Sequence, residues 1–404
     1  MQNQPGLTNG AIAFLSPAAL ARALYSHAVT NLFETLTFAH GPAMKNRFML
    51  APMTNQQSHP DGRLSDDERR WLVMRARGGF GLTMTCAAHV QAVGQGFPGQ
   101  LGIFSDDHVE GLTGLAAAIK AEGSLAVVQL HHAGARSPAE LIGRQPVCPS
   151  DEPESGARAL TGNEVERLIA DFIAAAARAR RCGFDGVEIH GAHGYVLAQF
   201  LSPTSNQRTD AYGGSAENRA RIVREILDGV RERCGEHFNV GLRLSPERFG
   251  LRLPDIVELA QQVMLSGVID YLDMSLWDYT KRPEDERFRA RLLRDYFLEL
   301  DRGRTRLGVA GKIDSGDAAR ACIGDGFDFV SIGRAAIVHH DFVQRIAAEP
   351  DFTMAALPVT VERLRAEGLG PAFINYMRRW EGFVAADTPI DMPGQGAVSR
   401  HRRG

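Results

Sequence analysis

The sequence predicts a single α/β domain folded as a closed (β/α)8 TIM barrel, with an N-terminal helical extension and a long loop after the third strand. Two observations predict this fold. Eight short apolar or β-branched runs recur between Phe48 and Gly333, and helical patterns that often end in glycine separate them. Such an alternation of eight strands with helices is typical of a parallel barrel.

The predicted strands are, in order, Phe48–Thr54, Gly81–Ala87, Leu125–His131, Gly186–His190, Val240–Ser245, Tyr271–Ser275, Leu307–Lys312 and Phe329–Gly333. Helices are predicted between them over residues 66–78, 106–123, 163–183 and 215–235, each of which closes on a glycine. An open doubly wound sheet is the alternative fold. It would require a Gly-x-Gly-x-x-Gly turn after the first strand, where LAPMTNQQS contains no glycine.

Two long inserts follow the third and fourth strands, at residues 133–160 and 193–215, and both are expected to be loops. In a barrel the loops that follow strands line the active-site face. Both inserts are therefore expected to border the site.

The two ends of the chain differ from its centre. Residues 1–30 are predicted to be an N-terminal extension with a short helix that begins at Ser16-Pro17. The barrel is predicted over residues 31–385, and residues 386–404 are predicted to be a flexible tail. The N-terminal helix and the segment FINYMRRW are candidate contacts in a homo-oligomer.

Composition and charge exclude several classes of partner. Lysine and arginine number 45 against 48 acidic residues, and the basic residues are scattered, which argues against a nucleic-acid interface. The five cysteines are odd in number and not at metal-type spacings, as expected of reduced thiols. No apolar run reaches the length of a membrane span, and the N-terminus does not resemble a signal peptide. A cytoplasmic protein without a membrane or nucleic-acid partner is expected.

Polar residues stand at or just after the ends of most predicted strands. Because parallel barrel strands all end on one face, residues far apart in the sequence are expected to meet there. These residues are Thr54, Gln129, His131, His190, His193, Tyr195, Arg243, Lys312 and Arg334. The sequence therefore predicts one active site at that face.

The stretch GVEIHGAHGY places His190, His193 and Tyr195 at the end of the fourth strand. Imidazole donors can polarise a carbonyl oxygen while a phenol delivers a proton nearby. The alternative is a metal-dependent barrel hydrolase or lyase whose ligands are His131, His190 and His193 with a carboxylate, although a strand end is not the helical HExxH arrangement. A barrel that binds a ligand without catalysis is a third hypothesis.

Two glycine-bearing turns, VAGKIDSGDAA and VSIGRAAI, follow the seventh and eighth strands and lead into helices. Backbone N–H groups at a helix N-terminus favour a phosphate, and barrels often hold one at these positions. Gly311, Lys312, Gly333 and Arg334 are therefore candidate phosphate ligands. Otherwise the glycines serve only tight turns.

Several motifs together resemble the Old Yellow Enzyme family of FMN-dependent ene-reductases. They are NRFMLAPMT, VVQLHHAGAR, VEIHGAHGYVLAQFLSPTSNQRTDAYGGSAENR, LRLSPERF and IGRAAI, and they occur in the order of the family from about Leu32 to Ile337. The resemblance implies one barrel that holds FMN non-covalently at its C-terminal mouth, with NADH or NADPH as reductant. It also implies ping-pong reduction of the C=C bond of an enone or enal, with hydride transfer through flavin N5.

The resemblance further implies a role for each site residue. Gln129 would read the pyrimidine edge of the flavin, and Arg243 would stabilise the reduced ring unless it serves only in a buried ion pair. His190 and His193 would hold the substrate carbonyl while Tyr195 protonates Cα, and Trp277 would either cap the substrate pocket or pack under a loop. The complete set of implied FMN ligands is Pro52, Met53, Thr54, Ala87, Gln129, Arg243, Gly311, Lys312, Gly333 and Arg334.

The segment SNQRTDAYGGSAENR is expected to be structural rather than catalytic. Arg208 and Asp210 are expected to pair, and Gly213-Gly214 to form a tight turn. Ser215 is expected to cap the helix that follows.

Overall fold

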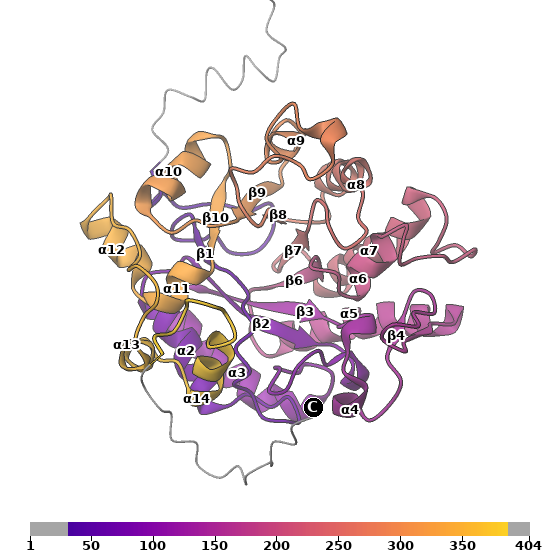
Figure 1. Cartoon of the computed structure of the whole chain (residues 1–404), viewed down its shortest axis with the longest axis horizontal. Helices are drawn as coiled ribbons and strands as arrows, with labels where there is room; N and C mark the ends of the chain where they lie inside the picture. Colours follow the sequence, from indigo (N-terminus) through magenta and orange to yellow (C-terminus); the bar gives the residue numbers. More distant parts are fainter. Residues whose placement is uncertain (1–30, 387–404) are drawn as a thin grey trace, which may run out of the picture.

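Eight parallel strands close into a barrel in the computed structural model, which describes residues 31–386 (Figure 1). The order around the barrel is β1-β10-β9-β8-β7-β6-β3-β2. The strands are β1 (Phe48–Leu50), β2 (Leu82–His89), β3 (Leu125–His131), β6 (Gly186–Gly191), β7 (Asn239–Leu244), β8 (Tyr271–Ser275), β9 (Arg306–Ala310) and β10 (Phe329–Ile332). The predicted barrel is confirmed, while the predictions for residues 1–30 and 387–404 lie outside the described residues.

The first strand is shorter than predicted. It ends at Leu50, and Ala51 still donates its N–H to the carbonyl of Ile332 at 3.0 Å. Pro52 follows, and proline has no N–H with which to continue a ladder. The prediction that this strand reaches Thr54 was therefore wrong at its C-terminal end.

Helices follow the strands and surround the barrel (Figure 1). Side-chain caps fix where several of them begin, since Ser65, Thr161 and Ser215 each accept a bond from the N–H three residues later. The four predicted segments correspond to α2 (Asp66–Arg77), α3 (Val109–Ala121), α5 (Gly162–Arg181) and α7 (Ala216–Cys234). Outside the two inserts, the other described helices and 3-10 turns are η1 (Ala92–Gly94), η2 (Asp106–His108), α8 (Leu253–Leu265), η4 (Glu286–Phe288), α9 (Asp295–Leu298), α10 (Gly316–Gly324), α11 (Arg334–Val338), α12 (Phe342–Ala348), α13 (Val361–Ala366) and α14 (Pro371–Met377).

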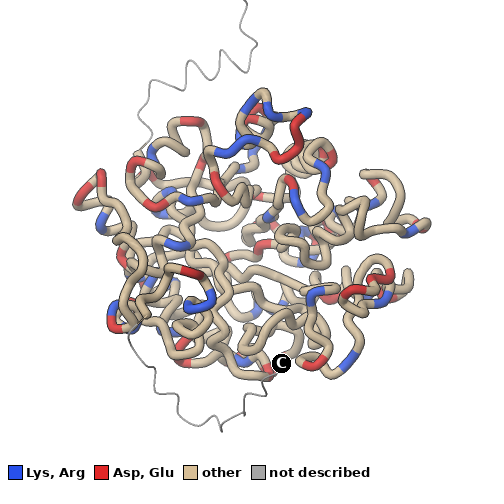
Figure 2. Tube along the Cα trace, viewed as in Figure 1, with Lys and Arg blue, Asp and Glu red and all other residues tan. Residues whose placement is uncertain are grey.

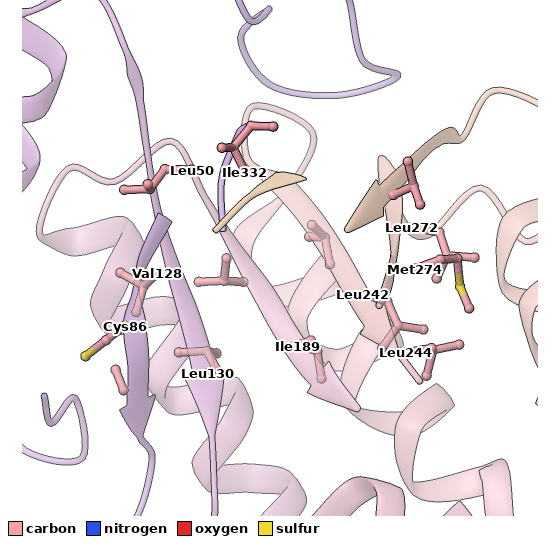
Figure 3. Close-up of a cluster of buried hydrophobic side chains, with 14 of the residues drawn as sticks. Leu50, Cys86, Val128, Leu130, Ile189, Leu242, Leu244, Leu272, Met274 and Ile332 are labelled. Carbon is pink, nitrogen blue, oxygen red and sulfur yellow. The ribbon is translucent and has the colours of Figure 1, made fainter. Parts of the chain in front are cut away.

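Side chains of the barrel strands alternate between an outer apolar layer and the barrel interior. Residues of the interior set, such as Gln129, Glu188 and Asp273, are buried and polar. Figure 3 shows part of the outer layer, which includes Leu50, Cys86, Val128, Leu130, Ile189, Leu242, Leu244, Leu272, Met274 and Ile332. The two-residue period therefore separates the core that stabilises the fold from the residues available for chemistry.

A second apolar cluster fills the end of the barrel where the strands begin. It consists of Leu36, Met44, Met49, Leu82, Met84, Val127, Tyr271 and Phe329. Leu36 and Met44 also form an antiparallel bridge across the start of the described chain. Because this end is packed with apolar side chains, polar chemistry is confined to the opposite, C-terminal end of the strands.

Both inserts contain more regular structure than the predicted loops. The first holds η3 (Gly134–Arg136), α4 (Ala139–Ile142) and a small parallel pair of strands, β4 (Val147–Cys148) with β5 (Arg158–Ala159). The second begins with α6 (Val196–Leu201), all of whose residues are buried. Burial of α6 gives this apolar segment an order that its polar surroundings in the sequence conceal.

Arg208 joins the two inserts. It forms the predicted ion pair with Asp210, donates from Nη1 to the carbonyl of Pro149 at 3.0 Å, and also donates to the carbonyl of Leu160. Ser215 accepts from the N–H of Asn218 at 3.2 Å, as predicted for a helix cap. This segment thus holds the loops of the strand-end face in place.

Positively and negatively charged residues are interspersed along the described chain (Figure 2). All five cysteines are buried and free. Within residues 31–386, no helix combines the length and the apolar character needed to cross a membrane.

Candidate active site

The predicted site residues meet at the C-terminal end of the barrel. In the strand register, Gln129 lies opposite Glu188, His190 opposite Arg243, and Arg243 opposite Asp273. These residues belong to the adjacent strands β3, β6, β7 and β8, and the members of each pair lie side by side in the sheet. The barrel therefore brings together residues that are widely separated in the sequence.

Unusual backbone conformations gather at the same end. Within residues 31–386, all six non-glycine residues with positive φ follow barrel strands: Gln56, His193, Arg248, Phe249, Trp277 and Lys312. A non-glycine residue with positive φ is uncommon, and such backbone conformations cluster at functional sites. His193, with φ of 61°, is held by a hydrogen bond from its N–H to Ser245 Oγ at 3.0 Å.

A buried polar network lies inside the barrel beneath this face. Gln129 Nε2 donates to Glu188 Oε1 at 2.7 Å, and Arg243 Nε lies 3.2 Å from Asp273 Oδ2. Burial, followed by the nearby Asp273 carboxylate, raises the pKa of Glu188 to about 8. Burial also raises the pKa of Asp273, against the opposing effect of Arg243. Two carboxyl groups thus share one cation in the interior, so one of them tends to keep its proton.

His131, His190, His193 and Tyr195 form an aromatic cluster above this network. The ring centroids of His190 and His193 are 5.1 Å apart, and those of His190 and Tyr195 are 5.4 Å apart. Burial, with smaller effects from Arg243 and Arg136, lowers the pKa of His193 to about 3, and burial lowers the pKa of His190 well below its usual value. Burial raises the pKa of Tyr195. At neutral pH the cluster therefore holds neutral imidazoles and a protonated phenol.

Hydrogen bonds fix the orientation of two of these imidazoles. His193 Nε2 lies 2.8 Å from Ser275 Oγ. His131 Nδ1 lies 3.0 Å from Gln100 Nε2, which can only donate, so Nδ1 accepts and the ring proton of His131 is on Nε2. His131 Nε2 and His190 Nδ1 are buried and have no hydrogen-bond partner. The cluster therefore presents unsatisfied imidazole nitrogens, which is unusual in a protein interior.

The three histidines do not form a metal-binding group. Among the described residues, the one set of three or more metal-type ligands whose ligand atoms lie within 4.8 Å of one another is His339, Asp341 and Glu367. In that set Arg345 pairs with Asp341 at 2.8 Å, and His340 pairs with Glu367 at 2.7 Å. The arrangement of His131, His190 and His193 thus gives no support to the metal-dependent hydrolase.

Half-buried residues surround the polar cluster at the barrel mouth. Pro52, Met53 and Thr54 follow β1, and Ala87 lies in β2 with its carbonyl accepting from Gln100 Nε2 at 2.8 Å. A Cβ placed on Gly333 would have Met53 Sδ, at 3.6 Å, as its nearest neighbour. These predicted flavin contacts are therefore adjacent and partly open, in contrast to the packed opposite end of the barrel.

The predicted phosphate ligands lie after β9 and β10. Gly311 has φ of 158°, and a Cβ there would approach Tyr279 N to 2.9 Å. Lys312 is 54% exposed and pairs with Asp278 at 2.9 Å, while Arg334 is exposed at the start of α11. Gly311 is thus required for close packing of the loop after β8, and Lys312 has a carboxylate partner that the sequence did not reveal.

Trp277 lines a small pocket beside His193. The pocket also includes Ser245, Arg248 and Ser275, and the Arg248 Cζ lies 4.7 Å from the centre of the Trp277 ring. Trp277 is 56% exposed, so it does not pack beneath a loop. It stands at the edge of the site, where a substrate cap would be expected.

Sequence reasoning missed four residues of the site. Glu188 and Asp273 could have been found from the two-residue period, because they precede His190 and Ser275 on the same faces of their strands. Ser275, the partner of His193, is likewise the last residue of β8. Arg136, which lies beyond the end of β3 in an insert, is the last residue of the motif VVQLHHAGAR, but nothing in the sequence placed it beside Tyr195.

The residues of this face fit the flavin that the motifs imply. An isoalloxazine ring needs an apolar surface, an amide that both donates and accepts, and a cation near the oxygens that gain charge on reduction. Met53 and Ala87 would supply the apolar surface, Gln129 the amide and Arg243 the cation. The unsatisfied nitrogens of His131 and His190 add donors or acceptors for a further molecule.

Comparison with known proteins gives the same result. The family model described as "NADH:flavin oxidoreductase / NADH oxidase family" matches residues 31–351. A probable NADH-dependent flavin oxidoreductase of Bacillus subtilis, YqiG, is 40% identical over 78% of this chain and 87% of its own length. The Old Yellow Enzyme homologue of Zymomonas mobilis is 28% identical, with a TM-score of 0.71 over 83% of this chain and 96% of that chain.

Morphinone reductase in complex with tetrahydroNAD is another structural neighbour. It is 27% identical, with a TM-score of 0.70 over 88% of this chain and 98% of that chain. Fold, site composition and similarity thus agree. The chain belongs to the NADH:flavin oxidoreductase / NADH oxidase family, that of Old Yellow Enzyme, and is an FMN-dependent NAD(P)H oxidoreductase.

Proposed function

We propose that the enzyme reduces the C=C bond of α,β-unsaturated carbonyl compounds at the expense of NADH or NADPH. The observation that carries this proposal is the contact of Tyr195 with His190 and His131, whose ring centroids lie 5.4 and 4.3 Å from that of Tyr195. A protonated phenol next to neutral imidazoles suits a reaction in which a carbonyl oxygen accepts hydrogen bonds while a carbon atom accepts a proton.

FMN, when bound, supplies the chemistry of accepting a hydride from NAD(P)H and donating one to the substrate. In this proposal Pro52, Met53, Thr54, Ala87, Gln129 and Arg243 bind the ring, and Gly311, Lys312, Gly333 and Arg334 bind the phosphate. The Arg243 cation supports negative charge that develops on the ring. The residues of the barrel interior thereby tune the cofactor, while those of the aromatic cluster act on the substrate.

His190 and His193 are proposed to donate hydrogen bonds to the substrate carbonyl oxygen. Both are neutral at physiological pH, so each offers one N–H without adding a charge. Ser275 orients His193 through the 2.8 Å contact with Nε2, and Trp277 borders the same pocket. Withdrawal of electron density from the carbonyl makes the β-carbon more electrophilic.

Tyr195 is proposed to protonate the α-carbon. Burial keeps its pKa above the usual value, so the phenol retains its proton at neutral pH. Substrate and nicotinamide are proposed to occupy this one face in turn, as in a ping-pong reaction. The structural neighbour morphinone reductase supports the proposal, since it is by its name a reductase of morphinone and its structure was determined in complex with tetrahydroNAD.

The Tyr195→Phe variant tests the proposal. We expect the variant to be reduced by NADPH or NADH at the rate of the wild type, because no proton from Tyr195 is required in that half-reaction. Reoxidation by 2-cyclohexenone should slow about 100-fold or more, as is typical when a general acid is removed. Stopped-flow absorbance of the flavin measures each half-reaction separately.

Tyr212→Phe is the matched control. Its hydroxyl donates to Glu225 at 2.9 Å, in the second insert and outside the aromatic cluster, so both half-reactions should be unchanged. Equal reoxidation rates for Tyr195→Phe and the wild type would disprove the role of Tyr195. A wild-type enzyme whose reduced flavin reacts with no activated alkene would disprove the proposed reaction.

A further inference from the structure

Arg136 places a guanidinium group directly over the proposed proton donor. Its Cζ lies 4.6 Å from the centre of the Tyr195 ring, and its Nη1 donates to the carbonyl of His193 at 2.6 Å. The cation–π contact and this hydrogen bond hold an otherwise exposed side chain in one position. Arg136 therefore borders the space next to Tyr195 from the side of the first insert.

The charge of Arg136 is not balanced by a carboxylate. None of the ion pairs between residues 31–386 includes it. Other cations at this end of the barrel are paired, since Arg243 lies 3.2 Å from Asp273 and Lys281 lies 2.6 Å from Glu247. Arg334 likewise belongs to none of the ion pairs within residues 31–386, and the proposed phosphate site accounts for it.

The side chains around Arg136 do not compensate for its charge. His190, His193 and His131 are neutral at physiological pH, because burial lowers the pKa of each. Tyr195 is neutral as well, since burial raises its pKa. The substrate side of the site thus carries one uncompensated positive charge, and it lies beside the proton donor.

We infer that Arg136 binds a carboxylate on the substrate, so that the preferred substrates are α,β-unsaturated carbonyl compounds that carry a carboxylate group. This inference rests on the proposed function. A guanidinium has five N–H donors in a planar fork, and the carbonyl of His193 uses only one of them. Such a fork matches the two oxygens of a carboxylate, and a side chain that is already fixed loses little entropy on binding.

The test compares an anionic and a neutral substrate with the same double bond, monomethyl fumarate and dimethyl fumarate. In Arg136→Gln we expect kcat/KM for monomethyl fumarate to fall about 10- to 100-fold, mainly through KM, as for loss of a charge-assisted hydrogen bond. The value for dimethyl fumarate should change less than about twofold. Arg136→Lys keeps the positive charge but not the planar fork of donors, so its kcat/KM for monomethyl fumarate should lie between that of the wild type and that of Arg136→Gln.

A binding measurement separates substrate affinity from catalysis. Monomethyl succinate and dimethyl succinate lack the double bond and cannot be reduced. The dissociation constant of monomethyl succinate, measured from the change in flavin absorbance or by calorimetry, should rise about 10-fold or more in Arg136→Gln, and the effect should shrink at high salt. Arg144→Gln, at an exposed position in the same insert, is the control and should change neither constant.

Other outcomes would overturn the inference. If Arg136→Gln slowed both fumarates equally and moved the alkaline limb of the pH profile with dimethyl fumarate, Arg136 would act on Tyr195 rather than on the substrate. If the variant changed neither substrate, the guanidinium would have no role in recognition. If the wild type reduced dimethyl fumarate and Arg136→Gln reduced both fumarates as fast as the wild type, only this inference would fail. If the wild type reduced neither fumarate and also failed to reduce 2-cyclohexenone, the proposed function itself would be disproved.

Discussion

Glu188 and Asp273 are buried carboxyl groups that share Arg243 within the barrel. Taking a carboxylate out of water is costly unless it is paired and hydrogen-bonded. Asp273 lies 3.2 Å from Arg243, while Glu188 accepts only the 2.7 Å hydrogen bond from Gln129. The proton therefore belongs on Glu188, whose pKa burial raises to about 8.

This shift predicts that Glu188 destabilises the protein as the pH rises. Below a pH of about 4.5 the carboxyl is protonated in both the folded and the unfolded chain. Between that value and a pH of about 8, the folded state binds more protons, so the free energy of unfolding falls with increasing pH. We expect Glu188→Gln to remove this contribution, so that the free energy of unfolding at pH 8.5 minus that at pH 6, measured by urea unfolding, is more positive than in the wild type. An exposed control, Glu110→Gln, should retain the wild-type difference, and an identical pH slope in Glu188→Gln would contradict the assigned proton.

The turn before α7 shows how a short element depends on particular glycines. Gly213 has ordinary φ, but a Cβ there would lie 2.1 Å from the carbonyl oxygen of Arg208, the residue that joins the two inserts. Gly214 has φ of 79° and no atom within 4 Å of the position of a Cβ. The two adjacent glycines are thus required for different reasons, a close approach and a left-handed conformation.

This difference predicts unequal effects of alanine. Gly214→Ala should lower the free energy of unfolding by about 1 kcal/mol, the cost of a left-handed alanine. Gly213→Ala must displace backbone and should cost more, about 2–3 kcal/mol. Urea unfolding of both variants measures the difference. Equal costs, or a larger cost at Gly214, would show that the Arg208 backbone moves freely.

At the scale of the whole molecule, burial of histidines at the strand-end face makes the fold sensitive to acid. Burial lowers the pKa of His132 and His193 to about 3 and that of His89 to about 4, and it lowers the pKa values of His131 and His190 well below the usual value. In the unfolded chain each histidine binds a proton near its ordinary pKa of about 6.5. The unfolded state therefore takes up more protons below that pH.

We expect the free energy of unfolding to decrease as the pH falls from about 7 to 5, because protons then bind preferentially to the unfolded chain. Urea unfolding across this range gives the number of protons taken up. Glu188 acts in the opposite direction, so Glu188→Gln should steepen the decrease. A stability that stays constant from pH 7 to 5 would mean that the histidines are not kept neutral by burial.

The sequence was sufficient to predict the barrel and the end of the barrel at which the candidate site residues meet. Each predicted strand corresponds to one strand of the barrel, because strand, helix and turn patterns are local properties of the chain. The rule that parallel strands end on one face then places His190, His193, Tyr195, Gln129 and Arg243 together. The first strand was predicted too long. Pro52 has no N–H with which to form the hydrogen bond to a neighbouring strand, and this loss becomes relevant only when β1 is paired within the sheet. The roles assigned to these residues remain predictions.

Contacts between distant segments were decided only by the tertiary structure. The pairing of Lys312 with Asp278 and of His193 with Ser275 joins segments that belong to different strands and loops, and these contacts cannot be predicted from local sequence pattern. Arg136 illustrates this most clearly, since it is an ordinary arginine of a polar insert until folding sets it over Tyr195. Local sequence specifies strands, helices and turns through propensity and periodicity, whereas charge compensation, burial and proton affinity depend on which distant groups the closed barrel brings into contact.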